Sequence, residues 1–391
     1  MKDKCFVFTG LQPWDLPIGS NAINIAGEVS RNNFVLYVNT PKDSISLILK
    51  KLIKRDKNYQ TGKKQVRQIA KTLWVADCPF YVLPVNVLPD GFIFDFFNRL
   101  NNKKILSYAK KIASQLGFKD IIHFIDNDIY RSFYSKEYLK PSLSVYYRRD
   151  YLFFVDYWKK HAIRLEPLLI SKSDLVVCNS PQLAEFALIH NPDSFCIGQG
   201  LDLTAYDIET KFEIPEAMLS ISEPRIGYIG NITSMRLDAD LIYELAKNRP
   251  ELSFVMVGGE DKHFESHKLH NLKNVYFLGS IKPELVPAYT SALQVCINPQ
   301  LINELTMGNY PRKVDEYLAL GKPVIATKTA TMDLFKDHVY LCSNIGEYLI
   351  ALDKALNDNS IESVEKRVNF AKSHSWENNV KSLYDCIEKK L

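Results

Sequence analysis

The sequence predicts an α/β fold made of two doubly wound units, and three observations lead to this prediction. Short apolar runs rich in β-branched and aromatic residues alternate with helical patterns along nearly the whole chain, which is typical of parallel strands joined by crossover helices. The alternation occurs twice, on either side of a stretch at 204–224 that is rich in Pro, Ser and charge. A length of 391 residues suits two domains of about 150 residues or more.

The predicted elements follow in chain order. The strands of the first half are CFVFTG, NFVLYVN, IIHFI, SVYY and DLVVCNS, with a helix over 20–31 after the first of them. Those of the second half are RIGYIGN, LSFVMVGG, VYFLGS, LQVCINP and PVIAT, with helices near 238–248, 283–291 and 311–320. We expect one domain over 1–204, a linker and second domain over 205–375, and a closing helix over 376–391 that packs back on the first domain.

Composition excludes several classes of protein. With 46% hydrophobic and 24% charged residues, the chain is neither disordered nor fibrous. A net charge of +4 is too small for a protein whose whole surface binds nucleic acid. The N-terminus reads as a strand and not as a signal peptide, and no apolar run is long enough to span a bilayer. Seven scattered cysteines without a C-x-x-C pair indicate reduced thiols, so we expect a cytoplasmic protein.

The first candidate phosphate site is the turn after RIGYIGN. Gly230 and Asn231 end a strand, and Asp238 begins a helix. Glycine lets a ligand approach the backbone closely, while free N–H groups and the forked guanidinium of Arg236 suit a diphosphate. An ordinary strand-to-helix turn with a solvent-facing arginine is the alternative, because the spacing matches no standard phosphate-binding loop.

The second candidate is the helix predicted within 309–329. Pro311 begins it and Gly321 ends it, before the strand PVIAT. Lys313 and Glu316 lie three residues apart on nearly one face. There an ammonium can meet phosphate oxygens and a carboxylate can accept hydrogen bonds from ribose hydroxyls. A surface Lys–Glu pair is the alternative interpretation.

At this segment the sequence resembles the nucleotide-sugar glycosyltransferases of the GT-B fold, in particular the large retaining family that includes bacterial polysaccharide and teichuronic-acid-type enzymes. The shared pattern is P-x-K-x-x-E-Y-L-A-x-G-K-P-V-I-A-T, which begins here at Pro311. The resemblance implies two Rossmann-like domains that face a central cleft. It also implies that Glu316 contacts the ribose of the donor and that Lys313 and Arg236 contact its diphosphate.

Further segments match the family in order. The stretch 277–299 resembles the part that holds the nucleotide base, through the residues Leu278, Gly279, Ser280 and Ile281. The stretch 14–26 resembles the loop under the transferred sugar, with Gly19 allowing close approach. Residues 373–391 resemble the closing helix.

Three positions depart from the family pattern. Gly308 stands where many relatives carry a glutamate eight positions before Glu316, so Glu304 or the peptide at 307–309 would have to substitute. Ile125 stands where a second histidine would follow His123. Gln294 stands where an aspartate commonly begins the strand.

The resemblance implies transfer with retention of configuration, and the chemistry needs the leaving diphosphate to be stabilised. Arg236 and Lys313 would supply fixed positive charge, so we expect no metal and no other cofactor. Asp126 and Asp128 follow a predicted strand and are candidates to orient the acceptor hydroxyl, with Asp150 as a third. A D-x-D metal site at 126–128, a polar turn and helix capping are the other interpretations of these carboxylates.

The segment 42–72 carries ten Lys or Arg against two Asp, interleaved with Leu and Ile. It can form an amphipathic basic helix, and four phenylalanines follow at 92, 94, 96 and 97. This pattern favours peripheral contact with an anionic membrane and a lipid-linked acceptor. A solvated basic face is the alternative, and nucleic acid is not expected. His263, His267 and His270 could share a helical face, but no further ligand completes a metal site.

The sequence as a whole therefore predicts an enzyme that moves a sugar from a nucleotide-diphosphate sugar to a glycan or lipid-linked acceptor in surface polysaccharide synthesis. An epimerase or phosphorylase of the same fold and a non-catalytic nucleotide-binding scaffold are the alternatives.

Overall fold

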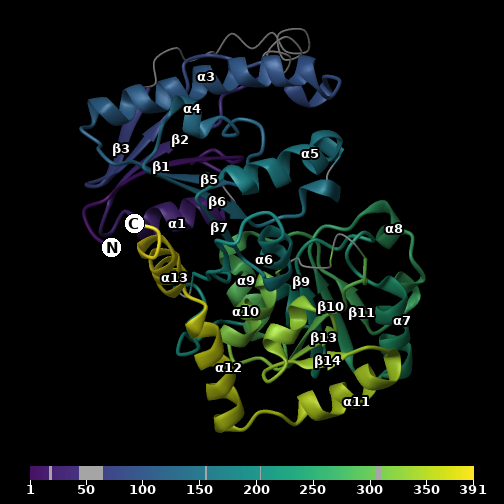
Figure 1. The fold of residues 1–391 in the computed structure, drawn as a ribbon. Helices are drawn as coiled ribbons and strands as arrows, with labels where there is room; N and C mark the ends of the chain where they lie inside the picture. The colour runs from purple at the N-terminus through teal and green to yellow at the C-terminus, as the bar shows by residue number, and fades with distance from the viewer. Residues whose placement is uncertain (17–19, 44–64, 155, 203, 304–305, 307–309) are drawn as a thin grey trace, which may run out of the picture. The chain divides into compact units, whose positions relative to one another are not determined.

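The computed structural model of the chain describes residues 1–391 except 17–19, 44–64, 155, 203, 304–305 and 307–309. The chain divides into two compact units (Figure 1). Unit 1 contains Met1–Gly198 and Asn379–Leu391, and unit 2 contains Gln199–Asn378. Each unit is built on a mainly parallel sheet, which confirms the predicted α/β fold.

Unit 1 has an eight-stranded sheet in the order β3-β4-β2-β1-β5-β6-β7-β8. Every strand pairs in parallel with its neighbours except β3, which is antiparallel to β4. The strands are β1 (Cys5–Gly10), β2 (Phe34–Val38), β3 (Val66–Ala70), β4 (Leu73–Ala76), β5 (Ile122–Asp126), β6 (Leu143–Arg148), β7 (Leu175–Cys178) and β8 (Ser194–Cys196). The middle strands β1, β5 and β6 are buried almost throughout because helices cover both faces.

The helices of unit 1 pack against this sheet by their apolar sides. Ala109 of α3 lies in one buried cluster with Val7 and Leu36, and Leu165 of α5 lies in another with Ile125 and Val176. The helices are α1 (Asn21–Val29), η1 (Val85–Val87), α3 (Phe92–Gln115), α4 (Ser135–Tyr138), η2 (Leu152–Phe154), α5 (Asp156–Lys172), α6 (Pro181–Leu188) and the end of α13 (Trp376–Glu388).

Unit 2 has a six-stranded sheet in the order β11-β10-β9-β12-β13-β14, parallel throughout. The strands are β9 (Arg225–Ile229), β10 (Ser253–Val257), β11 (Val275–Phe277), β12 (Val295–Asn298), β13 (Val324–Thr327) and β14 (Tyr340–Cys342). Five of them coincide with the strands expected from RIGYIGN to PVIAT.

Two helical layers cover the sheet of unit 2. Ile242 of α7 and Leu352 of α11 pack on one face, and Val314 and Leu318 of α10 pack on the other. The helices are η3 (Glu216–Met218), α7 (Ala239–Asn248), α8 (Lys262–Glu265), η4 (Lys268–Asn271), η5 (Pro283–Leu285), α9 (Val286–Ser291), α10 (Arg312–Ala319), η6 (Thr331–Phe335), α11 (Ile345–Leu356) and α12 (Ile361–Ser373).

The strand orders identify one special edge in each sheet. In unit 1 the order reverses between β1 and β5, and in unit 2 between β9 and β12. At such a topological switch point the crossover helices diverge to opposite faces, and ligands bind beyond the carboxyl ends of the strands. The ends of these four strands are therefore where functional side chains are expected.

Two features of the chain differ from the sequence-based expectations. The stretch 204–224 is not a free linker, because Met218 and Ile221 are buried in the core of unit 2. The basic segment 42–72 is not helical throughout, because Val66–Ala70 forms β3, whose backbone pairs with β4. The rest of that predicted helix, 44–64, lies outside the described residues. No helix in the described part of the chain is long and apolar enough to cross a membrane.

Candidate functional site

Three glycines draw the ends of β9, β10 and β11 together in unit 2. Gly230 and Gly258 have φ angles of +143° and +150°, a conformation that side chains with a Cβ rarely adopt. A Cβ on Gly258 would lie 1.9 Å from the carbonyl oxygen of Gly230. The Gly258 N–H donates to the carbonyl of Gly279 at 2.9 Å. The strand ends therefore form one continuous backbone edge.

The loop after β9 is fixed to the loop after β10. The Ile232 N–H donates to the Gly259 carbonyl at 2.9 Å, and the Asp261 carboxylate accepts from both the N–H and the hydroxyl of Ser234, at 2.7 and 2.8 Å. This loop carries Arg236, which is exposed and has no ion-pair partner among the described residues. Asp238 caps α7 by accepting from the Leu241 N–H at 2.9 Å, as the sequence predicts.

Helix α10 is held over the switch point by two buried polar contacts. The Tyr317 hydroxyl accepts from the Ile229 N–H at 2.9 Å and donates to the Ile229 carbonyl at 3.3 Å. The strand pairing of β9 with β12 ends two residues earlier, at Gly227, so the phenol replaces a missing strand neighbour. The buried Asp315 carboxylate contacts His374 and Tyr310, both at 2.8 Å.

Lys313 extends from α10 toward the end of β9. Its ammonium donates to the Tyr228 hydroxyl and lies 3.9 Å from the centre of that ring. A Cβ on Gly230 would lie 2.7 Å from the Lys313 Nζ atom. The pKa of Lys313 is lowered to about 7, chiefly by burial; the charge of Glu316 opposes this shift and the charge of Arg236 adds to it. The three residues singled out from the sequence thus influence one another electrostatically.

Glu316 is not paired with Lys313. Its carboxylate accepts from the Arg312 guanidinium at 3.0 Å, and 13% of the side chain is exposed. The Tyr206 hydroxyl also hydrogen-bonds to Glu316, and burial raises the pKa of that phenol. The alternative interpretation of a surface Lys–Glu pair therefore does not describe these residues.

The residues expected around a nucleotide base lie on the same edge. Leu278 and Ile281 are half-buried against the core of unit 2, and Gly279 and Ser280 are exposed. The Leu278 N–H donates to Met256 in β10 at 2.9 Å. Asn231 is exposed, and its carbonyl accepts from the Tyr228 hydroxyl at 3.1 Å.

Sequence reasoning missed several residues of this edge. Gly258 follows β10 as Gly230 follows β9, and that repeated signal was available in the sequence. No sequence signal marked Tyr228 or Asn298. Asn298 ends β12 and is fully buried, and neither polar atom of its side chain has a hydrogen-bond partner among the described residues.

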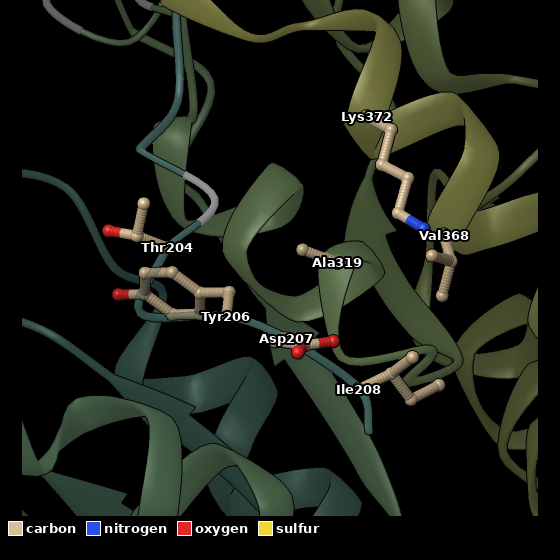
Figure 2. Close-up of a pocket in the computed structure, with 7 residues that line it drawn as sticks. All are labelled: Thr204, Tyr206, Asp207, Ile208, Ala319, Val368 and Lys372. Atoms are coloured by element: carbon tan, nitrogen blue, oxygen red, sulfur yellow. The ribbon is translucent and has the colours of Figure 1, made fainter. Parts of the chain in front are cut away.

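A separate cavity of about 460 Å³ lies beside α10. Figure 2 shows Ala319 of α10 between Tyr206 on one side and Val368 and Lys372 of α12 on the other. Tyr206, which lines this cavity, also contacts Glu316. Neither Lys313 nor Gly230 contributes to its lining.

In unit 1 the switch point places Asp126 beside Gly10. The two residues pair across β1 and β5, and a Cβ on Gly10 would lie 2.8 Å from the Asp126 Cβ. The fully buried Asp126 forms an ion pair with Arg149 at 2.7 Å, and Arg149 also contacts the half-exposed Asp150 at 2.6 Å. Burial raises the pKa of Asp126, while the charge of Arg149 opposes this shift.

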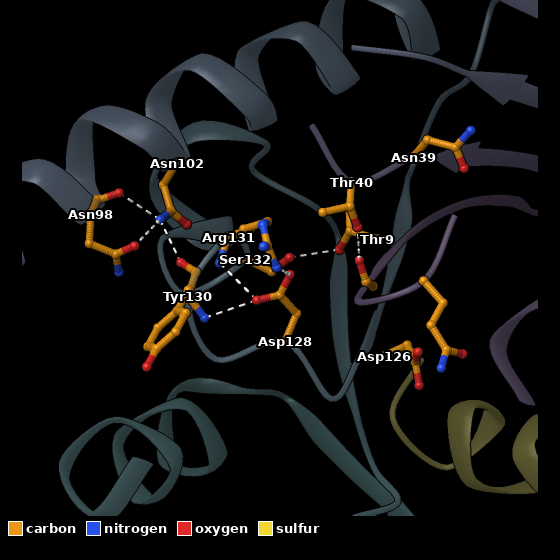
Figure 3. A network of polar contacts seen from close by, with 12 residues as sticks. Thr9, Asn39, Thr40, Asn98, Asn102, Asp126, Asp128, Tyr130, Arg131 and Ser132 are labelled. Atoms are coloured by element: carbon orange, nitrogen blue, oxygen red, sulfur yellow. Dashed lines mark hydrogen bonds and ion pairs between the residues drawn. The ribbon is translucent and has the colours of Figure 1, made fainter. Parts of the chain in front are cut away.

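The hydrogen-bond partners of Asp128 all belong to the turn that follows it. Its carboxylate accepts from the N–H groups of Tyr130 and Arg131, both at 3.0 Å, and from the Arg131 guanidinium at 3.1 Å (Figure 3). The competing interpretation of a capped polar turn describes this residue. His123 is also buried, between Thr9 at 2.8 Å and Ser135 at 2.6 Å, and burial lowers its pKa to about 3. It is a neutral core histidine.

Several sequence-based candidates lie outside the described residues: Gly19, Glu304, Gly308 and the rest of 307–309. Gln294 accepts from the Arg225 N–H at 2.8 Å. Within the described ranges, no group of three or more His, Cys, Asp or Glu is arranged to hold a metal ion, and His270 instead contacts Glu260 at 2.9 Å.

Comparison with known families identifies the segment that carries this edge. Residues 223–358 match the model of the family described as Glycosyl transferases group 1. The matched residues lie within unit 2 and are similar to that family; we call them the group 1 segment. The group 1 segment includes β9 to β14 and α10, and therefore Arg236, Lys313 and Glu316.

One curated relative of this chain is TuaH of Bacillus subtilis (strain 168), whose name assigns it provisionally to teichuronic acid biosynthesis as a glycosyltransferase. It is 31% identical over 160 residues. The match covers 39% of this chain and 40% of TuaH.

Solved structures match the whole chain at low sequence identity. Sucrose-phosphate synthase from Thermosynechococcus elongatus has a TM-score of 0.66 at 14% identity over 99% of both chains. Anabaena HepE, solved in complex with UDP and glucose, has a TM-score of 0.65 at 15% identity over 99% of this chain and 100% of its own. These matches show that the chain has the GT-B fold.

Proposed function

We propose that the protein is a glycosyltransferase that moves a sugar from a nucleoside-diphosphate sugar to a glycan or lipid-linked acceptor in surface polysaccharide synthesis. The observation that supports this most is the convergence of Lys313, Gly230 and Arg236 at the switch point of unit 2. The names of TuaH and of HepE with its UDP and glucose point to the same class of reaction.

The proposed donor site uses each group for one part of the ligand. The diphosphate lies against Gly230 and Asn231, where Lys313 and Arg236 supply positive charge. The ribose hydroxyls donate to Glu316, and the base lies along the backbone of Leu278–Ile281. The depressed pKa of Lys313 fits a cation that waits for an anionic partner, because a buried ammonium without one favours its neutral form.

The proposed transfer breaks the bond between the anomeric carbon and the diphosphate oxygen and forms a bond from the acceptor oxygen on the same face, so configuration is retained. The acceptor proton passes to the leaving phosphate. Negative charge grows on the diphosphate as the bond breaks, and Lys313 and Arg236 stabilise it in place. These two side chains can supply that charge themselves, so we propose that the reaction needs no metal.

On the acceptor side, the structure changes the roles that we propose. Asp126 and Asp128 are buried and committed to Arg149 and to a turn, so neither is placed to meet an acceptor directly. Asp150, half-exposed at the other end of Arg149, is the carboxylate that we propose contacts the acceptor hydroxyl. Asp126 then acts as a positioning residue through Arg149.

We also propose that the protein works at the inner face of the cell membrane, where a lipid-linked acceptor would be presented. The excess of basic residues in 42–72 supports this contact, because each Lys or Arg near an anionic surface contributes about 1 kcal/mol to binding.

A donor panel tests the proposed function. UDP-, GDP- and ADP-sugars are each added to the protein, and unfolding is followed by heating. A true donor at a hundredfold excess over its dissociation constant stabilises the fold by about 2.7 kcal/mol. Release of the nucleoside diphosphate only when acceptor is present would separate transfer from an epimerase or phosphorylase.

Glu316→Ala should weaken binding of that donor by about 100-fold, because two hydrogen bonds to a charged group are lost. Glu362→Ala is the matched control, since this exposed glutamate of α12 contacts only Lys366 among its described neighbours. Unchanged donor affinity in Glu316→Ala would remove this residue from the site.

Donor affinity should also depend on pH through Lys313. Below its pKa of about 7, the ammonium is already present and the dissociation constant is flat. Above it, binding must protonate Lys313, because the diphosphate raises its pKa, so the dissociation constant rises up to about tenfold per pH unit. Titration calorimetry with a nucleotide sugar between pH 6 and 9 measures this. Lys313→Met should abolish the slope, and a slope that persists in the variant would exclude Lys313 as its source.

A further inference from the structure

The exposed side of α3 in unit 1 carries apolar side chains near the start of the helix and basic side chains after them. The exposed residues near the helix start are mainly apolar, and from Arg99 onward they are mainly basic. The apolar part consists of Phe92, Ile93, Phe96 and Leu100. The basic part consists of Arg99, Lys103, Lys104, Lys110 and Lys111. We call this set the α3 stripe.

The α3 stripe is one continuous face of the helix. Its members recur at spacings of three and four residues, which places them on a single side. The opposite side, with Phe94, Leu106 and Ala109, is buried in unit 1. At a rise of about 1.5 Å per residue, the 24 residues of α3 span about 36 Å.

The apolar part of the stripe is exposed on a firmly held helix. The ring of Phe92 is 83% exposed and that of Phe96 is 51% exposed, and the two rings stack 6.4 Å apart. The start of the helix is nevertheless fixed, because Arg164 of α5 forms ion pairs with Asp90 at 2.7 Å and Asp95 at 2.9 Å. Fraying therefore does not explain the exposure of these rings.

The charge of the stripe has one sign. Asp95 is the sole acidic residue in the sequence of α3, and it is neutralised by Arg164. A second copy of this chain is a poor occupant, because a symmetric contact would place two basic rows against each other. Protruding aromatic rings beside a row of cations suit an anionic bilayer, into which the rings insert while the cations meet the headgroups.

We propose that the α3 stripe is the surface by which unit 1 docks on an anionic lipid membrane, with Phe92 and Phe96 inserted at the level of the headgroups. This inference deepens the proposed membrane contact and rests on it, but it names residues other than 42–72. Glycosyl transfer itself is not needed for it to hold.

Sedimentation with lipid vesicles tests the inference on the full chain. The protein is expected to bind vesicles of phosphatidylcholine and phosphatidylglycerol and not vesicles of phosphatidylcholine alone. Phe92→Ser with Phe96→Ser should weaken binding about tenfold or more. Changing Lys103, Lys110 and Lys111 to Gln should weaken it by about 100-fold, at about fivefold for each lysine.

The matched control replaces exposed apolar residues of unit 2, Ile350→Ser with Ile361→Ser, which are 59% and 79% exposed in the parent chain. This control should bind vesicles like the parent. Thermal stabilisation by the donor, measured without vesicles, should be equal in all variants, which separates failure of this inference from failure of the proposed function.

The inference would be overturned if the Phe92→Ser, Phe96→Ser variant bound vesicles as the parent does. That conclusion would hold even if replacing the basic residues of 42–72 abolished binding. The inference would also be overturned if the parent protein were dimeric without lipid and the double variant were monomeric. A second copy of the chain would then cover the α3 stripe.

Discussion

Replacing Lys313 with methionine should lower the rate of transfer at saturating donor by about 10²- to 10³-fold. That is the usual loss when one preorganised group that stabilises developing negative charge is removed. Methionine keeps much of the aliphatic stem beside Tyr228, so the fold should persist. Stability should stay equal or increase, because the variant no longer buries an ammonium whose pKa burial lowers to about 7. Steady-state rates and a thermal melt measure the two effects.

Lys322 provides the matched control for this experiment. It is another largely buried lysine of the same domain, but its ammonium donates to the carbonyls of Ser291 at 2.6 Å and Leu293 at 2.7 Å. Lys322→Met should destabilise the fold by about 1–3 kcal/mol, because two carbonyls lose their donor, while the folded enzyme keeps its rate. An equal loss of rate in both variants would show that Lys313 acts only through stability.

Gly258→Ala should cause the largest loss of stability, about 3 kcal/mol or more. Alanine at a φ of +150° is strained, and its Cβ would lie 1.9 Å from the Gly230 carbonyl. The strand ends would have to separate, which also displaces Gly230 from Lys313. We therefore expect donor binding to be lost even at temperatures where the variant is folded, as measured by calorimetry.

Gly117→Ala separates strain from collision. Gly117 has a φ of +77°, but a Cβ there would meet no atom within 4 Å. This variant should lose about 1 kcal/mol and retain donor binding, because Gly117 lies outside the proposed site. If Gly258→Ala bound the donor as tightly as Gly117→Ala does, the close contact between Gly258 and Gly230 would not shape the site.

Local pattern was enough to predict the helix that bears Lys313 and Glu316 and most of the described strands, though not β3, β4, β8 and β14. The strands after residue 224 are short apolar runs that each end at a small or polar residue, and such runs have few alternatives to a buried parallel strand. The three-residue spacing of Lys313 and Glu316 fixed their common face because helix geometry is local.

Contacts between distant segments could not be predicted in the same way. Whether Lys313 turns toward Glu316 or Tyr228 depends on how α10 sits on β9, 85 residues away in sequence. From the sequence, Asp126 could contact an acceptor, but the fold pairs its carboxylate with Arg149. Val66–Ala70 reads as part of a basic helix, yet pairing with β4 supplies strand hydrogen bonds that no helical pattern reveals. Met218 and Ile221 read as linker because their burial comes from the core of unit 2.

The hydrogen bonds of Tyr317 limit how far α10, which carries Lys313 and Glu316, can shift relative to β9. A helix packed on a sheet by apolar side chains alone can shift along its axis when the core beneath it changes. Here one hydroxyl binds both polar groups of Ile229, which limits such a shift to a few tenths of an ångström. Apolar substitutions beneath α10 that keep these two hydrogen bonds should therefore change the distance between the Lys313 ammonium and the end of β9 very little.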